Sequence, residues 1–199
     1  MAEPEKTENR NTHNQLLTHL LSRRSAFAGD LHRPGPDDAQ QTAMFTAAVR
    51  VPDHGRLAPW RFIVLGEQTR RGLEAWAEGA LSVLRPDMPA EKRRRDIGEF
   101  SDVPFVTAVV SKAAEHPRIP KHEQELSAAA ACLALMLAAE SLGFATRWTT
   151  GWRAEYPEFR ERLNLAPGET IAGLILVGTP RAMPEPRSYP APADVVTRL

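Results

Sequence analysis

Cysteine is almost absent from this chain of 199 residues, since Cys132 is the only one. An internal disulfide and a zinc site built on cysteines are therefore excluded. A chain that uses so little cysteine is typical of a reducing compartment, and we expect a cytoplasmic protein. Net charge is also absent, because 25 Lys and Arg balance 25 Asp and Glu. No overall field therefore favours nucleic acid or an anionic membrane as a partner.

Long apolar runs are missing as well. Residues 127–139 form the longest uncharged helical stretch, which is shorter than the roughly 20 residues of a membrane span. Residues 1–13 are polar and charged, without the apolar centre of a signal peptide, and we expect them to be a disordered lead-in. The remaining length predicts one domain over residues 14–180, followed by an extended tail over residues 181–199.

Several familiar functional motifs do not occur. There is no Walker-type Gly-x-x-x-x-Gly-Lys loop, no Gly-x-Gly-x-x-Gly fingerprint after a strand and no Gly-x-Ser-x-Gly elbow. The six histidines never fall at the His-Glu-x-x-His spacing of a helical zinc site. His122, Glu123 and Glu125 would not face one point on a helix, so we expect no metal site. Ser-His-Asp catalysis stays open, because spacing alone does not exclude it.

Apolar periodicity and turn residues predict an α+β domain. The predicted helices cover residues 14–24, 38–49, 67–84, 121–142 and 155–163, and the charged segment 91–96 is typical of a solvated helix face. The predicted strands cover residues 60–65, 103–111, 144–150 and 170–177. Prolines at positions 180, 184, 186, 190 and 192 are expected to exclude regular structure from the tail.

The middle of the predicted helix over residues 121–142 is apolar on every face. Such a helix has to be buried on nearly every side. Its alanines would let another backbone approach closely, so we expect a second copy of the same helix beside it in a homodimer. The proline-rich tail is either disordered or wrapped over the partner subunit, and we expect it to pack on the partner.

Two clusters of basic residues are candidate anion sites. Arg23-Arg24-Ser25 ends the first predicted helix, and two guanidiniums with a hydroxyl suit a phosphate group. Arg50 and His54 lie in a loop between a helix and a strand, where ligand contacts are common. Both clusters also have an ordinary interpretation, as solvated charges at helix ends. The residues alone leave these alternatives open.

The motifs and their order resemble the nitroreductase family, flavin-binding oxidoreductases built as intertwined dimers. The resemblance spans residues 16–180 and rests on Arg23-Arg24-Ser25, on Arg50-Val-Pro-Asp-His54-Gly ahead of Ala58-Pro59-Trp60-Arg61-Phe62, on Glu123-Gln124-Glu125-Leu126-Ser127-Ala128, on Gly143-Phe144 leading to Trp148-Thr149-Thr150-Gly151, and on Leu176-Val177-Gly178-Thr179-Pro180. The Pro-Asp-His version is most similar to the small, single-domain members. The resemblance implies a three-layer α/β/α fold, with a central mixed, largely antiparallel sheet around the long buried helix.

The resemblance also implies a binding site for FMN. The residues implied to bind the cofactor are Arg23, Arg24, Ser25, Arg50, His54, Trp148, Thr149 and Thr150. The first three would hold the ribityl phosphate, and the next two would reach the flavin. The last three match the segment that passes along the isoalloxazine, where the family uses backbone donors near N5.

The implied activity is transfer of a hydride from NAD(P)H through flavin N5 to a nitro compound, quinone or similar acceptor, with ping-pong kinetics and the chemistry carried by the cofactor. Alternatives are a non-catalytic FMN-binding module of the same fold and a flavin-free structural dimer. The sequence departs from the family pattern at Phe27, where a basic residue is common, at Leu57, where an asparagine is common, and at Thr149, where an arginine is expected. Arg187 in the tail is a candidate for the missing phosphate contact.

Overall fold

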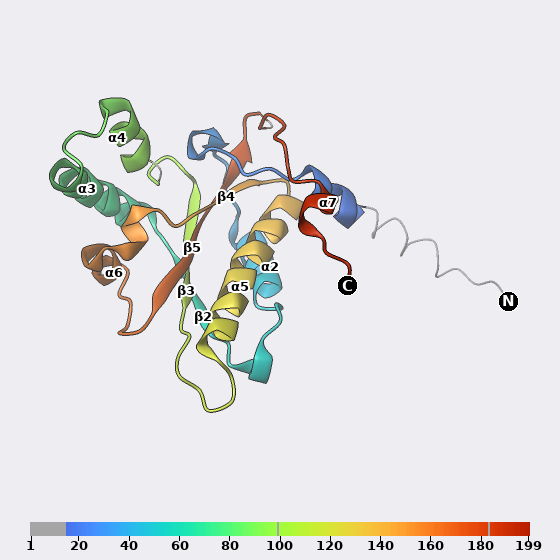
Figure 1. The fold of residues 1–199 in the computed structure, drawn as a ribbon. Helices are drawn as coiled ribbons and strands as arrows, with labels where there is room; N and C mark the ends of the chain where they lie inside the picture. The colour runs from blue at the N-terminus through green and yellow to red at the C-terminus, as the bar shows by residue number, and fades with distance from the viewer. Residues whose placement is uncertain (1–14, 99, 183) are drawn as a thin grey trace.

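The computed structural model describes residues 15–98, 100–182 and 184–199, and Figure 1 shows a sheet with helices on both faces. The helices are α2 (Asp38–Ala48), α3 (Glu67–Leu84), α4 (Ala90–Ile97), α5 (Lys121–Ser141), α6 (Pro157–Arg162) and α7 (Pro192–Val195), and residues 15–22 are helical too. The strands are β1 (Leu31–His32), β2 (Trp60–Val64), β3 (Phe105–Ser111), β4 (Ala145–Thr149) and β5 (Thr170–Pro180). Short 3-10 turns are η1 (Ala28–Asp30), η2 (His54–Arg56) and η3 (Trp152–Glu155). No helix in the described part of the chain is both long and apolar enough to cross a membrane.

Strand β5 is the centre of the sheet. β3 and β4 pair with opposite edges of β5, β1 pairs with the end of β5 at Thr179 and Pro180, and β2 pairs with the far edge of β3. All strand pairs that the structure describes are antiparallel. The prediction of a largely antiparallel sheet is therefore confirmed, and no parallel pair occurs among these strands.

The two faces of the sheet carry separate hydrophobic cores, because side chains alternate along β5. Leu174 and Leu176 join a cluster with residues of α3 and α6, whereas Ile175 and Val177 join a cluster with residues of α2 and α5. Figure 1 shows these pairs of helices on opposite sides of the strands. The three-layer α/β/α arrangement is confirmed, and it explains why β3 and β5 are nearly continuous apolar runs.

Asp37 fixes the beginning of α2. Its Oδ1 accepts a hydrogen bond from Gln40 N at 2.8 Å, and Gln40 Oε1 accepts one from Asp37 N at 2.9 Å. This reciprocal capping box satisfies two N–H groups at the helix start. Since α2 then ends at Ala48, the cap also sets where the loop with Arg50 and His54 begins.

Two local predictions are wrong in part. The prolines do not exclude all regular structure from the tail, because Pro192 begins α7. A backbone N–H in the first turn of a helix has no acceptor within the helix, so proline, which lacks this group, is tolerated there. Strand β5 continues to Pro180 rather than residue 177, because β1 pairs with its end. Burial of helix α5 on nearly every side stays a prediction, because it includes a second copy of the helix; in the single chain Leu126 is 66% exposed and Leu133 is 43% exposed. The predicted lead-in, residues 1–13, lies outside the described residues.

Candidate functional site

The arginine cluster of Arg23, Arg24 and Ser25 lies at the C-terminal end of α5. Arg23 Nε is 3.4 Å from Glu140 Oε2, and Arg23 Nη2 donates to Ser25 Oγ at 3.4 Å. Arg24 Nη1 donates to the backbone carbonyl of Glu185. Two guanidiniums and a hydroxyl form the kind of donor set that fits a phosphate group.

The C-terminal tail lies against the arginine cluster, and Figure 1 shows the red tail beside the blue N-terminal helix. Tyr189 Oη donates to the Arg23 carbonyl at 3.4 Å, and the Arg187 guanidinium lies 4.7 Å from the centre of the Tyr189 ring. Arg187 therefore stays a candidate for an additional phosphate contact. Packing of the tail on a partner subunit stays a prediction, and within the chain the tail contacts its own arginines.

The loop that carries Arg50 and His54 lies at the opposite, N-terminal end of α5. Ser127 Oγ donates to the Pro52 carbonyl at 2.6 Å, which fastens the loop to the helix. His54 Nδ1 is 2.8 Å from Glu123 Oε2, so the imidazole is held through one ring nitrogen. The Arg50 side chain is exposed beyond the end of α2.

Asp53 builds the turn that follows. Its carboxylate oxygens accept hydrogen bonds from Leu57 N at 3.2 Å and Ala58 N at 2.8 Å. Arg56 and Ala58 have positive φ angles of 54° and 45°, which residues other than glycine seldom adopt. Strain of this kind concentrates at functional sites, where the surrounding structure holds it in place. We therefore assign Asp53 to the shape of the loop rather than to a ligand.

Gln124, in the first turn of α5, anchors the long loop over residues 112–120. Its amide nitrogen donates to the carbonyls of Ala114 at 2.8 Å and Ile119 at 3.2 Å, and its amide oxygen accepts from Ala114 N at 3.1 Å. The side chain is buried, so it needs such partners. Sequence reasoning missed this role, because the partners belong to a loop without a recognisable pattern.

Strand β4 directs its side chains to the two faces of the sheet in turn. Trp148 packs under α5 against Gly173, where a Cβ would lie 2.4 Å from Trp148 Nε1. Arg147 and Thr149 point the other way and line a cavity of about 650 Å³. The Trp148 side chain is therefore part of the core, which leaves its backbone for any flavin contact. The Thr150 side chain is exposed.

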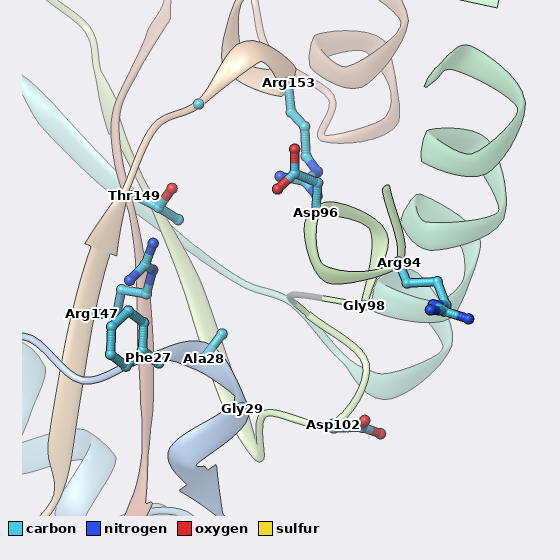
Figure 2. Close-up of a pocket in the computed structure, with 11 residues that line it drawn as sticks. Phe27, Ala28, Gly29, Arg94, Asp96, Gly98, Asp102, Arg147, Thr149 and Arg153 are labelled. Atoms are coloured by element: carbon cyan, nitrogen blue, oxygen red, sulfur yellow. The ribbon is translucent and has the colours of Figure 1, made fainter. Parts of the chain in front are cut away.

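The cavity lies between the end of β4, the turn η1 and helix α4. Its lining residues are Phe27, Ala28, Gly29, Arg94, Asp96, Gly98, Asp102, Arg147, Thr149, Gly151 and Arg153. Figure 2 shows Arg147 and Thr149 on one side and Arg153 with Asp96 opposite them. The cavity thus adjoins both the segment after the arginine cluster and the segment around residue 150. Sequence reasoning missed Arg147 and Arg153, although alternation from Thr149 could have indicated Arg147.

The buried Cys132 is not a candidate nucleophile. Burial raises the pKa of the Cys132 thiol to about 12, so this cysteine stays protonated and is a poor nucleophile.

Arg61 Nε and Nη2 donate to the two carboxylate oxygens of Glu169, each at 2.7 Å, and these hydrogen bonds lower the pKa of Glu169. Among the described residues, no three His, Cys, Asp or Glu side chains are grouped as a metal site requires.

The basic residues implied to bind one cofactor fall into two groups at opposite ends of α5. Arg23 contacts Glu140 and His54 contacts Glu123. At about 1.5 Å per residue, these two helix positions are about 25 Å apart, farther than the two ends of one FMN molecule. A single chain therefore does not bring the two groups to one site.

Comparison with known proteins places the chain in a family. The model of the Nitroreductase family matches residues 31–179. The Escherichia coli (strain K12) protein named "Putative NAD(P)H nitroreductase YdjA" is 34% identical over 166 residues, which cover 83% of this chain and 88% of that protein. This chain belongs to the nitroreductase family, as the resemblance of its motifs predicts.

Solved structures show the same fold. The nitroreductase-like family protein from Bacillus cereus superposes with a TM-score of 0.76 at 20% identity, over 92% of this chain and 95% of that one. A nitroreductase with bound FMN from Desulfitobacterium hafniense DCB-2 gives a TM-score of 0.70 at 24% identity, over 94% and 98% of the two chains. The nitroreductase-like fold is therefore shared along nearly the whole chain.

Proposed function

We propose that this protein is an FMN-dependent oxidoreductase that transfers a hydride from NAD(P)H to a nitro compound, quinone or similar acceptor. The observation that carries the proposal is the arginine cluster beside a cavity that is bordered by residues 27–29 and by Thr149 and Gly151. Membership of the family supports it. So do the name of the E. coli relative, which specifies NAD(P)H, and the FMN in the D. hafniense structure.

The residues of the cluster fit the phosphate of FMN. Arg23 Nη2 and Ser25 Oγ already lie together, and charge-assisted hydrogen bonds from guanidiniums are among the strongest that phosphate oxygens receive. The backbone of residues 148–150 is the segment assigned to the flavin ring. Bound FMN supplies the hydride transfer, with NAD(P)H and the acceptor reacting in turn in a ping-pong cycle. The chain's own residues bind and orient, and none is assigned as an obligatory acid or base.

A second copy of the chain is proposed to complete the site. The outer face of α5 exposes Leu126 and Leu133, and Leu133 lies near the midpoint between Glu123 and Glu140. In a two-fold dimer each surface patch meets its own copy, and with the axis perpendicular to α5 two α5 helices crossing near Leu133 would run in opposite directions. The N-terminal end of one α5 then lies beside the C-terminal end of the other. This arrangement would bring the partner's Arg50 to the arginine cluster.

The N-terminal helix supports the same dimer. Its leucines are unusually exposed for large apolar side chains, at 58%, 55%, 45% and 77% for Leu16, Leu17, Leu20 and Leu21. Contiguous apolar surface of this kind marks an interaction site in a protein of this size. The helix ends at the arginine cluster, so a partner that covers these leucines also covers the proposed phosphate site.

The test is the visible spectrum of the purified protein. We expect flavin absorbance that bleaches when NADH or NADPH is added without oxygen and returns when a quinone or nitro compound follows. A colourless protein that does not take up added FMN would overturn the proposal. A yellow protein that is bleached by neither NADH nor NADPH would indicate an FMN-binding module without this activity. Intersecting rather than parallel initial-rate lines would contradict the ping-pong order.

A further inference from the structure

Glu140 occupies an unfavourable place for a carboxylate. It stands in the last turn of α5, where the negative end of the helix dipole repels a negative charge, and its side chain is only 6% exposed. Three groups compensate for this. Thr146 Oγ1 donates to Oε1 at 2.5 Å, His19 Nε2 lies 2.9 Å from Oε2, and Arg23 Nε lies 3.4 Å from the same oxygen.

Arg23 forms an ion pair with Glu140 through Nε, and this pair restricts how its guanidinium is turned. The guanidinium is planar and rigid, so a partner at one edge fixes the direction of the other edge. The Nε side of Arg23 faces Glu140, while Nη2 faces Ser25 Oγ. Nε and Nη2 share one edge of a guanidinium, as in the Arg61–Glu169 pair, so Glu140 and the Ser25 hydroxyl assigned to the phosphate meet neighbouring nitrogens of the same planar group.

We infer that Glu140 is a positioning residue, which orients Arg23 so that its Nη edge and the Ser25 hydroxyl together bind the phosphate of FMN. This inference rests on the proposed function and adds a residue that the sequence motifs do not contain. Glu140 acts through Arg23 and makes no contact with the cofactor. Thr146 and His19 hold the carboxylate from β4 and from the N-terminal helix, so these two elements fix the position of the Glu140 carboxylate that pairs with Arg23.

The sign of the effect separates positioning from simple charge. A carboxylate close to a phosphate repels it, so Coulomb interaction alone predicts that removing the charge of Glu140 tightens FMN binding. Positioning predicts the opposite. We expect Glu140→Gln to weaken FMN binding about tenfold, the low end of what loss of an orienting partner costs at metal sites.

The experiment is a double-mutant cycle on the FMN dissociation constant. Wild type, Glu140→Gln, Arg23→Ala and the double variant are compared by equilibrium dialysis. If Glu140 acts through Arg23, its substitution weakens binding in the wild type and has little effect when Arg23 is already alanine. The ³¹P resonance of bound FMN should also shift in Glu140→Gln, which a remote loss of stability would not cause. Glu78→Gln, an exposed carboxylate on α3, is the matched control and should leave the FMN dissociation constant unchanged.

Two outcomes would overturn the inference. One is unchanged or tighter FMN binding by Glu140→Gln, and the other is equal weakening in the presence and absence of Arg23. Far-UV circular dichroism checks that the variants fold. If Glu140→Gln does not fold, Glu140→Asp replaces it in the cycle. The aspartate keeps the charge but retracts it by one methylene. Wild-type protein that binds no FMN would instead contradict the proposed function. Wild type that binds FMN and is weakened by Arg23→Ala alone contradicts only the role of Glu140.

Discussion

Trp148 lies across the β4–β5 pair against Gly173, and a Cβ at position 173 would come within 2.4 Å of the indole nitrogen. The same Cβ would be 3.0 Å from Cys132 Sγ, on the helix that covers this face. The indole nitrogen donates to the Ala172 carbonyl at 3.3 Å, so its polar group is satisfied in the core. The missing side chain of Gly173 thus provides the space in which the tryptophan packs.

Gly173→Ala is expected to destabilise the fold by about 1 to 3 kcal/mol, because overpacking a filled core displaces its neighbours. Urea unfolding measures the change. Gly79→Ala is the control, since nothing lies within 4 Å of a Cβ on this α3 glycine. It should be neutral or stabilising by up to about 1 kcal/mol, because alanine favours a helix over glycine. Equal loss of stability in both variants would contradict the packing described for Trp148.

The pair between Arg61 and Glu169 predicts a pH dependence of stability. Hydrogen bonds from Arg61 hold the pKa of Glu169 below its usual value, so the pair stabilises the fold above the pKa of the unfolded state. That contribution is lost as the pH falls through the lowered folded-state pKa. Glu169→Gln should cost about 1 kcal/mol at neutral pH, a modest value because solvent screens an arginine that is 35% exposed.

Urea unfolding of the wild type and Glu169→Gln at several pH values tests this dependence. The difference in the free energy of unfolding should shrink below about pH 4, where Glu169 takes up a proton in the unfolded state. A difference that stays constant down to pH 2 would show that the carboxylate charge contributes nothing.

Arg23→Ala is expected to weaken FMN retention. Loss of one charged hydrogen bond to the phosphate costs about 1.5 to 3 kcal/mol, or about one to two decades in the dissociation constant. Equilibrium dialysis with FMN measures the loss. Arg71→Ala is the control, because that arginine is exposed on α3 and pairs with Glu67 on its own helix. Equal FMN affinity of Arg23→Ala and wild type would show that the arginine cluster does not bind the phosphate.

Leu133→Glu is expected to separate the proposed dimer and to lower FMN binding with it. A charge at the centre of the apolar face of α5 would be desolvated in the interface, which is costly without a partner. Light scattering after size exclusion gives the mass of the species. Val83→Glu is the control, since Val83 is 79% exposed on α3, which covers the other face of the sheet. If light scattering gives Leu133→Glu the same oligomeric mass as the wild type, the dimer interface does not include this face of α5.

Most helices and strands could be predicted, because their patterns reflect burial on the two faces of the sheet. The apolar runs of β3 and β5 and the one-sided stripe of α3 carry this information in consecutive residues. The two residues of β1 are too few to show such a pattern, because this strand forms only by pairing with the end of β5. In the tail, the prolines predicted an interruption but not the helical turn that Pro192 begins.

The candidate site was only partly predictable, because it depends on residues far apart in the chain. The motifs indicated Arg23 and His54, and neither motif contains Glu140. Its partners His19, Arg23 and Thr146 come from the N-terminal helix and β4, and only the tertiary fold brings them together. The placement of the two basic groups at opposite ends of α5 likewise required the structure.

The central claim is that one FMN site takes residues from two chains, and complementation between inactive chains tests it most directly. Differently tagged Arg23→Ala and Arg50→Ala chains are co-expressed, the mixed dimer is purified through both tags, and its FMN is counted by titration. A shared site leaves one intact site in the mixed dimer and none in either parent, so we predict one tightly bound FMN per mixed dimer. A mixed dimer that binds FMN as weakly as both parents would show that each site lies within one chain, and would contradict the account.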